Sequence, residues 1–427
     1  MWSKQLHRFN LVRTLFQQGC ALIALLAWMS MTGCGKVPAP EFRFNEVEWL
    51  KQQKVHLSGD ETFPDNYRRE IGTLTTALFG TPDQPQFPFL EGEDTSARGI
   101  VDLERLRRAA GPVFSNRDGE SYGLYRAHCA HCHGITGDGA GSTAAAVQPY
   151  PRDFRLGKFK FKSTPLRRPP TDDDLTRVIR EGIPGTAMPS FRTLPNEDVA
   201  ALVDYVKYLT IRGEFERRLL AELSNLDGQP LLPMPLVSAL DEGQQASGDD
   251  RRVLDEQLSM AVGEWLREDI LPRWQRRERH IIAVPAPPPA IDPSDPQYSQ
   301  LVTTGRTLFY GKANCLQCHG DTGLGDGQQD NYDDWTNEWL KSPGVDPLNR
   351  STFRDFLSAG ALHPRPVRPR NLNVPVYRGG GQWETLYRRI AAGIEGTPMP
   401  SSPALSSDEI WAVVAYVLSM PYEPLTR

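Results

Sequence analysis

The amino-acid sequence predicts a mainly α-helical protein in which two small, similar helical domains are joined by a helical insert and a proline-rich linker. The first observation behind this prediction is an internal repeat, because the stretch 175–189 recurs 211 positions later as 386–400. The second is the spacing of apolar residues, which follows a helical period just beyond each copy of the repeat. The third is a Cys-x-x-Cys-His motif ahead of each copy. A repeated unit of this kind predicts one domain per copy.

Each copy is expected to contain short helices joined by irregular loops. Thr171 followed by three aspartates predicts a helix start, because threonine caps free N–H groups and acids favour the positive end of the helix dipole. Apolar periodicity predicts a closing helix over 196–209 in the first copy and over 407–419 in the second. The cysteine motifs recur at an offset of 186, so the second copy holds 211 − 186 = 25 additional residues, mostly in a loop over 328–369.

The remaining segments are expected to flank and separate the two copies. The N-terminal part is interpreted as an extension that packs on the first domain, with a helix around 101–110. Apolar residues at helical spacing between 253 and 274 predict a helical insert, and Pro285–Pro289 predicts a stiff spacer that holds the two domains apart. The expected organisation is a signal peptide over 1–33, an N-terminal extension over 34–112, a first domain over 113–212, an insert and linker over 213–296 and a second domain over 297–427.

The N-terminus resembles an export signal that ends at a lipid-attachment site. Residues 1–33 contain three Lys or Arg residues and no acid, and Cys20–Met31 form an apolar run too short to span a bilayer comfortably. The run ends in Met-Thr-Gly followed by Cys34, which resembles the bacterial lipoprotein cleavage box. The resemblance implies that Cys34 carries a lipid and anchors an exported, periplasmic protein to a bacterial membrane. Ordinary signal cleavage nearby, with Cys34 left as a free thiol, is the alternative.

Composition limits the number of domains and the class of partner. A chain of 427 residues, of which 39% are hydrophobic and 24% charged, suits two or three globular domains. The formal net charge is −5, and removing the three basic residues of the signal gives −5 − 3 = −8. Because nucleic-acid binding needs a clustered basic surface, this acidity argues against a nucleic-acid partner.

The two cysteine motifs carry the chemistry. Two thiols on one helical turn can reach the two vinyl groups of a single porphyrin, and the histidine that follows then points to the iron. The motifs therefore predict two covalently bound haem c groups, one in each copy. The residues concerned are Cys129, Cys132 and His133 in the first copy and Cys315, Cys318 and His319 in the second.

Two other interpretations of the cysteine pairs fit less well. A zinc site would need two more ligands beside each pair, and no further cysteine is left once Cys20 leaves with the signal and Cys34 carries lipid. A thioredoxin-like redox pair would be a single motif beside a βαβ pattern. The histidine after each pair and the export signal both favour haem attachment.

Each copy also contains a candidate for the sixth iron ligand. Met188 and Met399 lie in a shared Gly-Thr-x-Met-Pro sequence just ahead of the closing helix. A thioether opposite histidine raises the potential of the iron and closes it to other ligands. Buried gap-filling methionines are the alternative, and Met234 and Met420 are rival ligands because each also precedes a proline. Only Met188 and Met399 recur in register, which favours them.

Both copies resemble the class I-type, monohaem cytochrome c domain family, whose pattern runs from Cys-x-x-Cys-His-Gly through a methionine loop to a closing helix. The resemblance covers about 119–212 and 297–422. It implies a mostly helical fold around each haem, with one haem edge exposed for electron transfer. Arg152 and Arg370 occupy similar places in the two copies, where a guanidinium could bind haem propionates; a solvated surface arginine is the alternative.

The motifs favour an electron carrier over an enzyme. Two closed His/Met irons and no further catalytic group predict single-electron transfer between a redox donor and an acceptor, with a membrane respiratory complex as one possible partner. A dihaem enzyme of the bacterial cytochrome c peroxidase type is the alternative, but it needs one iron with an open position, and both copies keep the methionine loop. Lys160 and Lys162 alternate with phenylalanines, which predicts a solvated face or a surface that steers an acidic partner.

Overall fold

The computed structural model describes residues 39–59, 61–88, 97–226, 228–231, 262–328 and 330–422. The predicted signal peptide, Cys34, Met234 and part of the predicted helical insert (residues 232–261) lie outside the described residues. Residues from Glu41 onward form one compact unit, which is mainly helical as the sequence predicts. No helix within these described ranges is both long and apolar enough to cross a membrane.

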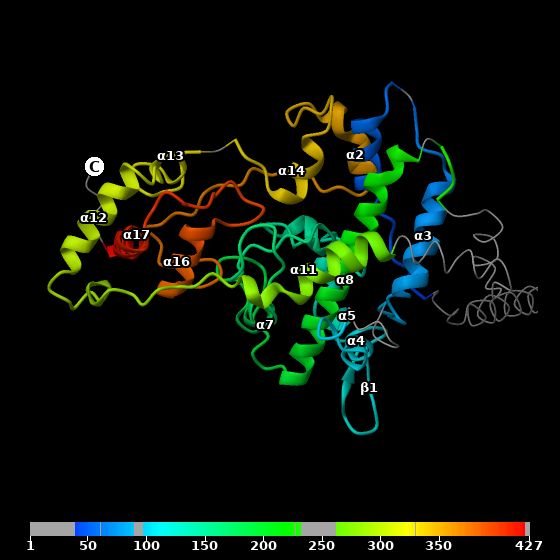
Figure 1. Ribbon diagram of the computed structural model, residues 1–427, viewed down its shortest axis with the longest axis horizontal. Coiled ribbons are helices and arrows are strands. Elements are labelled where there is room, and N and C mark those ends of the chain that lie inside the picture. The colour runs from blue at the N-terminus through cyan, green and yellow to red at the C-terminus, as the bar shows by residue number, and fades with distance from the viewer. Residues whose placement is uncertain are drawn as a thin grey trace, which may run out of the picture. The chain divides into compact units, whose positions relative to one another are not determined.

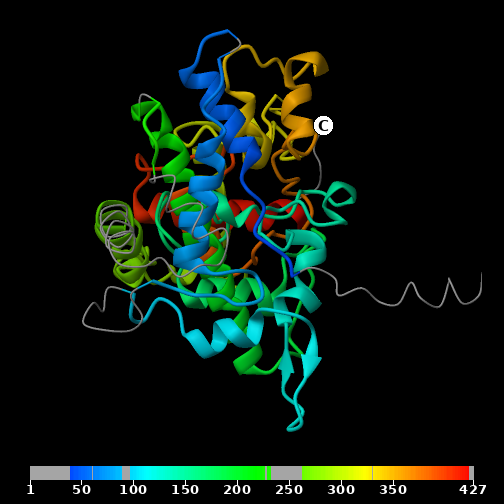
Figure 2. The same cartoon turned by 90° about the vertical axis from the view of Figure 1, so that its right-hand side faces the viewer.

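The first copy is built on one long helix, α8 (Asn196–Glu222). It begins where the sequence predicts but runs past the predicted end at 209, because Ile211, Phe215 and Leu219 continue its buried face. That face is covered by three helices of the N-terminal extension, which contact α8 in the views of Figures 1 and 2. These helices are α2 (Glu46–His56), α3 (Asn66–Phe79) and α4 (Leu103–Ala109).

Short elements around α8 carry the first cysteine motif and the first methionine loop. The predicted helix start at Thr171 is confirmed, because the Asp174 N–H donates to the threonine hydroxyl and the Thr171 N–H donates to the Asp174 carboxylate. Two short strands ahead of the cysteine motif form an antiparallel hairpin, in which Phe114 lies opposite Tyr122. The elements are β1 (Phe114–Ser115), β2 (Ser121–Tyr122), α5 (Leu124–His128), α6 (Ala130–His133) and α7 (Asp172–Glu181).

The second copy repeats four helices of the first in the same order: one before the cysteine motif, one within it, one before the methionine loop and a shorter closing helix. This helix, α17, spans the range that the sequence predicts, and it packs against the helix that precedes the second cysteine motif. Its buried side chains include Trp411, Val414 and Tyr416. The elements are α12 (Tyr298–Tyr310), α13 (Leu316–His319), α16 (Trp383–Ala392) and α17 (Ser407–Ser419).

The extra residues of the second copy form short helices where the sequence analysis expected a loop. Helices α14 (Asp334–Leu340) and α15 (Arg354–Ser358) bury Trp339 and Phe356 in a small core that also includes Leu50 of α2. The prediction that the two domains are held apart is therefore wrong. The physical reason is that the tryptophans of this insertion bury their apolar surface against the first domain and its extension.

The described part of the inter-domain insert packs back onto α8. A π-helical segment, η4 (Val262–Ile270), leads into α11 (Leu271–Gln275), and Trp274 Nε1 donates to Glu214 Oε2 at 3.1 Å. The proline-rich stretch that follows has no regular structure until Pro289. Short 3-10 turns span Ala144–Ala146, Phe154–Leu156, Leu223–Asn225, Arg277–His280, Pro289–Ile291, Arg350–Phe353 and Met420–Tyr422.

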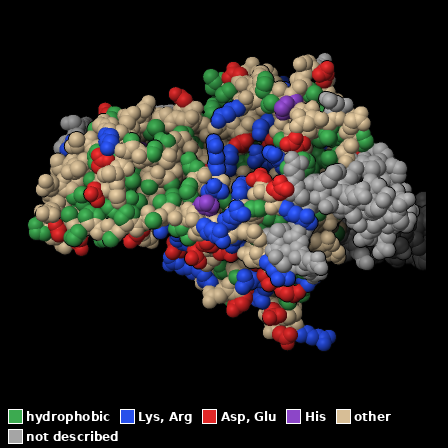
Figure 3. Space-filling model, in the orientation of Figure 1, with side chains coloured by type: hydrophobic (Ala, Val, Ile, Leu, Met, Phe, Trp, Pro, Cys, Tyr) green, Lys and Arg blue, Asp and Glu red, His purple; other side chains and the backbone are tan. Residues whose placement is uncertain are grey.

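Charged side chains are unevenly distributed on the face drawn in Figure 3. Lys and Arg side chains gather over the middle of this face, whereas the part formed by α12, α16 and α17 shows mostly uncharged side chains. The second domain therefore presents a less charged surface here than the first.

Candidate haem sites

In each copy, the histidine of the cysteine motif is held by a backbone carbonyl. His133 Nδ1 lies 3.0 Å from the carbonyl oxygen of Arg152, and His319 Nδ1 lies 3.1 Å from that of Arg370. A carbonyl only accepts hydrogen bonds, so Nδ1 carries the proton and Nε2 keeps a free lone pair. Metal-ligating histidines are oriented by such a bond from the second ring nitrogen, so both histidines fit the role of iron ligand.

Burial keeps both imidazoles in the form that binds iron. It lowers the pKa of His133 to about 4 and also lowers the pKa of His319 below its ordinary value. His133 stacks on Phe154, with ring centroids 4.6 Å apart. A neutral imidazole binds metal, so each histidine is ready to act as a ligand at neutral pH.

The four motif cysteines are half-buried free thiols. None of them forms a disulfide, and Cys132 Sγ lies 3.2 Å from Thr143 Oγ1. Burial raises the pKa of Cys129 to about 12 and the pKa of Cys315 to about 11. Burial disfavours the charged thiolate at these two positions. Because none of the four cysteines forms a disulfide, both pairs are available for thioether attachment to haem vinyl groups.

The two methionine loops have the same backbone structure. The Met188 N–H donates to Thr186 Oγ1 at 3.1 Å, and the Met399 N–H donates to Thr397 Oγ1 at 3.2 Å. Each methionine carbonyl accepts a hydrogen bond from the N–H of the isoleucine five residues earlier, at 3.1 Å in both loops. Both methionine side chains are half-buried. The sequence repeat is thus a repeat of loop geometry.

A glycine at the end of the preceding helix makes room for each methionine loop. Gly182 (φ +67°) ends α7, and a β-carbon there would lie 2.7 Å from the carbonyl oxygen of Met188. Gly393 (φ +75°) ends α16, and a β-carbon there would lie 2.7 Å from the carbonyl oxygen of Met399. Only glycine satisfies both the positive φ and the close approach.

Replacing Gly182 by alanine is therefore expected to displace the first methionine loop and destabilise the protein. The cost of the strained backbone is about 1–3 kcal/mol, before any steric clash. Thermal unfolding and the optical signature of methionine ligation would measure both effects. Gly72→Ala is the matched control, because no atom lies within 4 Å of a β-carbon at this helical glycine of α3. Equal effects of the two substitutions would contradict the prediction.

The structure places one rival methionine in the hydrophobic core. Met420 is 5% exposed, and a β-carbon on Gly323 would lie 2.2 Å from its Cε. At the repeat offset of 211 it corresponds to Leu209 of the first copy, which is also buried. Met420 thus occupies an apolar core position that both copies share. The other rival, Met234, lies outside the described residues.

Arg152 and Arg370 contribute backbone carbonyls, a role that the sequence analysis missed. The only sequence signal for this role is that the two arginines occupy matching places in the two copies. The Arg152 guanidinium pairs with Asp334, and Arg370 Nε donates to the carbonyl of Val376 at 2.9 Å. The contact of these side chains with haem propionates stays a prediction.

The lysines expected on a solvated or partner-facing surface pair instead with the second domain. Lys160 Nζ lies 3.5 Å from Asp334 Oδ1, and Lys162 pairs with Glu395. Both lysine side chains are largely buried. The predictions of a solvated face and of a partner-steering surface are therefore both wrong, because α14 and the second methionine loop cover this segment of the first domain.

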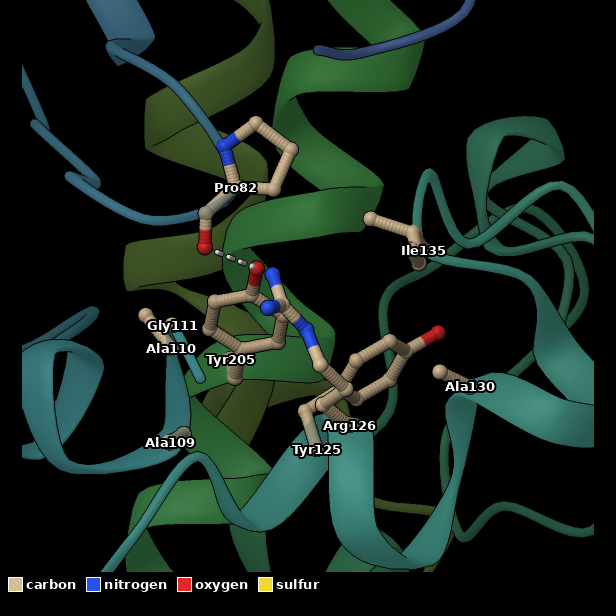
Figure 4. Close-up of a pocket in the computed structure, with 9 residues that line it drawn as sticks. All are labelled: Pro82, Ala109, Ala110, Gly111, Tyr125, Arg126, Ala130, Ile135 and Tyr205. Atoms are coloured by element: carbon tan, nitrogen blue, oxygen red, sulfur yellow. Dashed lines mark hydrogen bonds between the residues drawn. The ribbon is translucent and has the colours of Figure 1, made fainter. Parts of the chain in front are cut away.

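A pocket behind the first motif shows how the motif is supported (Figure 4). The Tyr205 hydroxyl of α8 donates to the carbonyl of Pro82 at 3.3 Å, and its ring lies 4.8 Å from that of Tyr125. The Tyr125 hydroxyl donates to the carbonyl of Gly134, just after the motif, at 2.8 Å. The pocket is lined by Pro82, Ala109, Ala110, Gly111, Tyr125, Arg126, Ala130, Ile135 and Tyr205. These side chains connect the motif to α4 and α8.

The helical fold and the two equivalent Cys/His sites define a protein with two c-type haem-binding domains. The family described as cytochrome c oxidase, cbb3-type, subunit III matches residues 117–206, and the family described as cytochrome c matches residues 302–421. The chain belongs to the cytochrome c family. Its two domains imply two covalently bound c-type haems with iron, and a role in haem-based electron transfer.

Two known proteins are similar to parts of the chain. Cytochrome c55X of Paracoccus denitrificans (strain Pd 1222) is 37% identical over 101 residues, which make up 23% of this chain and 79% of that protein. Among solved structures, a chain of the Kuenenia stuttgartiensis reducing HAO-like protein complex Kustc0457/Kustc0458 has a TM-score of 0.43 and 23% sequence identity. That comparison covers 72% of this chain and 97% of the other.

Proposed function

We propose that this chain is a membrane-anchored dihaem cytochrome c that carries single electrons between redox proteins on the periplasmic side of a bacterial membrane. One observation supports this proposal most directly: both copies combine a carbonyl-held, neutral histidine with an identically hydrogen-bonded methionine loop. The proposed iron ligands are His133 with Met188 and His319 with Met399.

The residues of each domain have distinct proposed roles. When bound, haem supplies a one-electron couple at its iron. The cysteine pairs fix the position of the group, and the arginine carbonyls hold each imidazole in the tautomer that exposes Nε2. The methionine thioethers would be the second protein ligands of each iron, and the glycines before them allow the backbone structure of the two loops. With both methionines bound, each iron would be closed to exogenous ligands, as a carrier requires.

The proposed membrane anchor is a lipid on Cys34. The lipoprotein-like sequence around this residue supports it, and so does the export signal before it. A lipid tether would keep the haem domains near membrane-bound donors and acceptors, such as a respiratory complex. Cell fractionation of the wild-type chain and of Cys34→Ser would test the anchor, with loss of the variant from the membrane fraction as the expected result.

An optical redox titration of the purified holoprotein, with carbon monoxide added to the reduced form, tests the function. We expect two low-spin haems, methionine–iron charge-transfer absorption from both in the oxidised state, and no gas binding. One high-spin or gas-binding haem would mean an open iron. In that case a peroxidase-type dihaem enzyme would replace the carrier as the proposed function.

A further inference from the structure

One carboxylate of the second domain lies between the two candidate sites. Asp334 begins α14, in the insertion that only the second copy contains, and its side chain is 7% exposed. The neighbouring Trp335 fixes its position, because Trp335 Nε1 donates to the carbonyl of Asp138 in the first domain at 3.1 Å. The insertion thus places a buried negative charge at the junction of the domains.

Toward the first site, Asp334 pairs with the residue that orients the iron-ligand histidine. Its Oδ2 pairs with Arg152 Nη1, and its Oδ1 lies 3.5 Å from Lys160 Nζ. The carbonyl of Arg152 is the acceptor for His133 Nδ1. A single residue, Arg152, therefore connects the Asp334 carboxylate to the hydrogen bond that holds His133.

Toward the second site, the same carboxylate lies against the methionine loop. A β-carbon on Gly396 would lie 2.2 Å from Asp334 Oδ2, and Gly396 is three residues before Met399. The residue before it, Glu395, pairs with Lys162 and accepts a hydrogen bond from the N–H of Arg167 at 3.0 Å. This loop is therefore fixed to the first domain by polar contacts.

The first methionine loop lies in turn against the segment of the second domain that holds His319. A β-carbon on Gly185, in the first methionine loop, would lie 3.8 Å from Arg370 Nη1 and 3.7 Å from Val376 Cγ1 of the second domain. The segment that holds His319 thus lies close to the methionine loop of the first domain, and the segment that holds His133 reaches the second methionine loop through Asp334. Asp334 is the carboxylate that lies between the segment that holds His133 and the second methionine loop.

We propose that Asp334 is a positioning residue shared by both haem sites, which holds Arg152 in place and sets the potentials of the two sites together. The proposal rests on the dihaem function proposed above. An oxidised iron carries one more positive charge than a reduced iron, so a nearby carboxylate favours oxidation. Low exposure weakens solvent screening of this charge, and both domains experience it.

Asp334→Asn keeps the shape and removes the charge, which leaves Arg152 and Lys160 without an anionic partner at this position. We expect both midpoint potentials to rise in a spectroscopic redox titration. At a fixed solution potential, the ratio of reduced to oxidised protein should rise about tenfold at the more affected site, which is about 59 mV for a one-electron couple. Asp334→Glu, which keeps the charge, should restore both potentials.

Glu338→Gln is the matched control, because it removes the same charge from the same helix. Glu338 pairs with Lys158, Lys51 and Arg217 and not with Arg152 or Lys160, so both potentials should stay unchanged. Lys160→Gln removes the opposite charge and should lower both potentials, which tests the proposal even if the Asp334 variants fail to fold. A shift at one site alone, or equal shifts in Asp334→Asn and Glu338→Gln, would overturn the proposal. Failure of the wild-type protein to show two one-electron steps would instead overturn the proposed function.

Discussion

Replacing Cys129 and Cys132 by alanine is expected to leave a chain that carries one haem where the wild-type chain carries two. The two thiols of the first motif are the only cysteines among the described residues of the first domain, so nothing else there can form the thioether bonds. Intact mass under denaturing conditions and haem absorbance per chain would measure the loss. Thermal stability should also fall, because Cys129 packs against the core of this domain.

The chain offers two controls for this experiment. Cys315→Ala with Cys318→Ala should remove the other haem and leave the first. His131→Ala changes an exposed residue inside the first motif, which is glutamine at the same place in the second motif, and should keep both haems. Two covalently bound haems in the Cys129/Cys132 variant would exclude these cysteines as the attachment site.

Replacing Met188 by alanine is expected to open one iron. The potential of that site should fall by on the order of 0.1–0.3 V, within the range of about 0.8 V that axial ligands cover. Methionine–iron absorption should drop by half, and carbon monoxide should bind to one reduced haem in each chain. Met399→Ala should do the same at the other site, since the two loops share their hydrogen bonds.

Met420→Leu is the control for both methionine variants. It replaces a buried core methionine by the residue that the first copy has at the equivalent position, Leu209. Swaps of similar volume in a core usually cost less than about 1.5 kcal/mol, so both the fold and the spectrum should be preserved. If Met420→Leu removed methionine–iron absorption while Met399→Ala kept it, the second iron would be assigned to the wrong methionine.

Local features of the fold could be predicted from the sequence because neighbouring residues determine them. The helix start at Thr171 depends on a threonine and an aspartate three residues apart, and the structure shows both capping bonds. The closing helix of the second domain spans 407–419 as predicted, since an uninterrupted apolar period ends there. The equivalence of the two methionine loops followed from their shared sequence.

Features that depend on distant partners could not be predicted in this way. Helix α8 runs on to Glu222 because the N-terminal extension covers its later turns, which periodicity within 196–209 does not show. The insertion at 328–369 is predicted as a loop, whereas it forms short helices in the structure. These helices bury their tryptophans against another domain, and the local sequence does not show that partner. The sequence suggests a role only for the Arg152 guanidinium, whereas its backbone carbonyl is the group that contacts His133.

The sequence by itself determined the class of cofactor, the number of haem domains and the residues expected to hold each haem. These depend on spacings of a few residues along one chain, which covalent geometry converts directly into a site. The tertiary structure alone decided that the two domains are docked and that Asp334 and Arg152, 182 residues apart, form a pair at their junction. Such a pair follows from how two surfaces bury each other, and no local pattern in the chain encodes that.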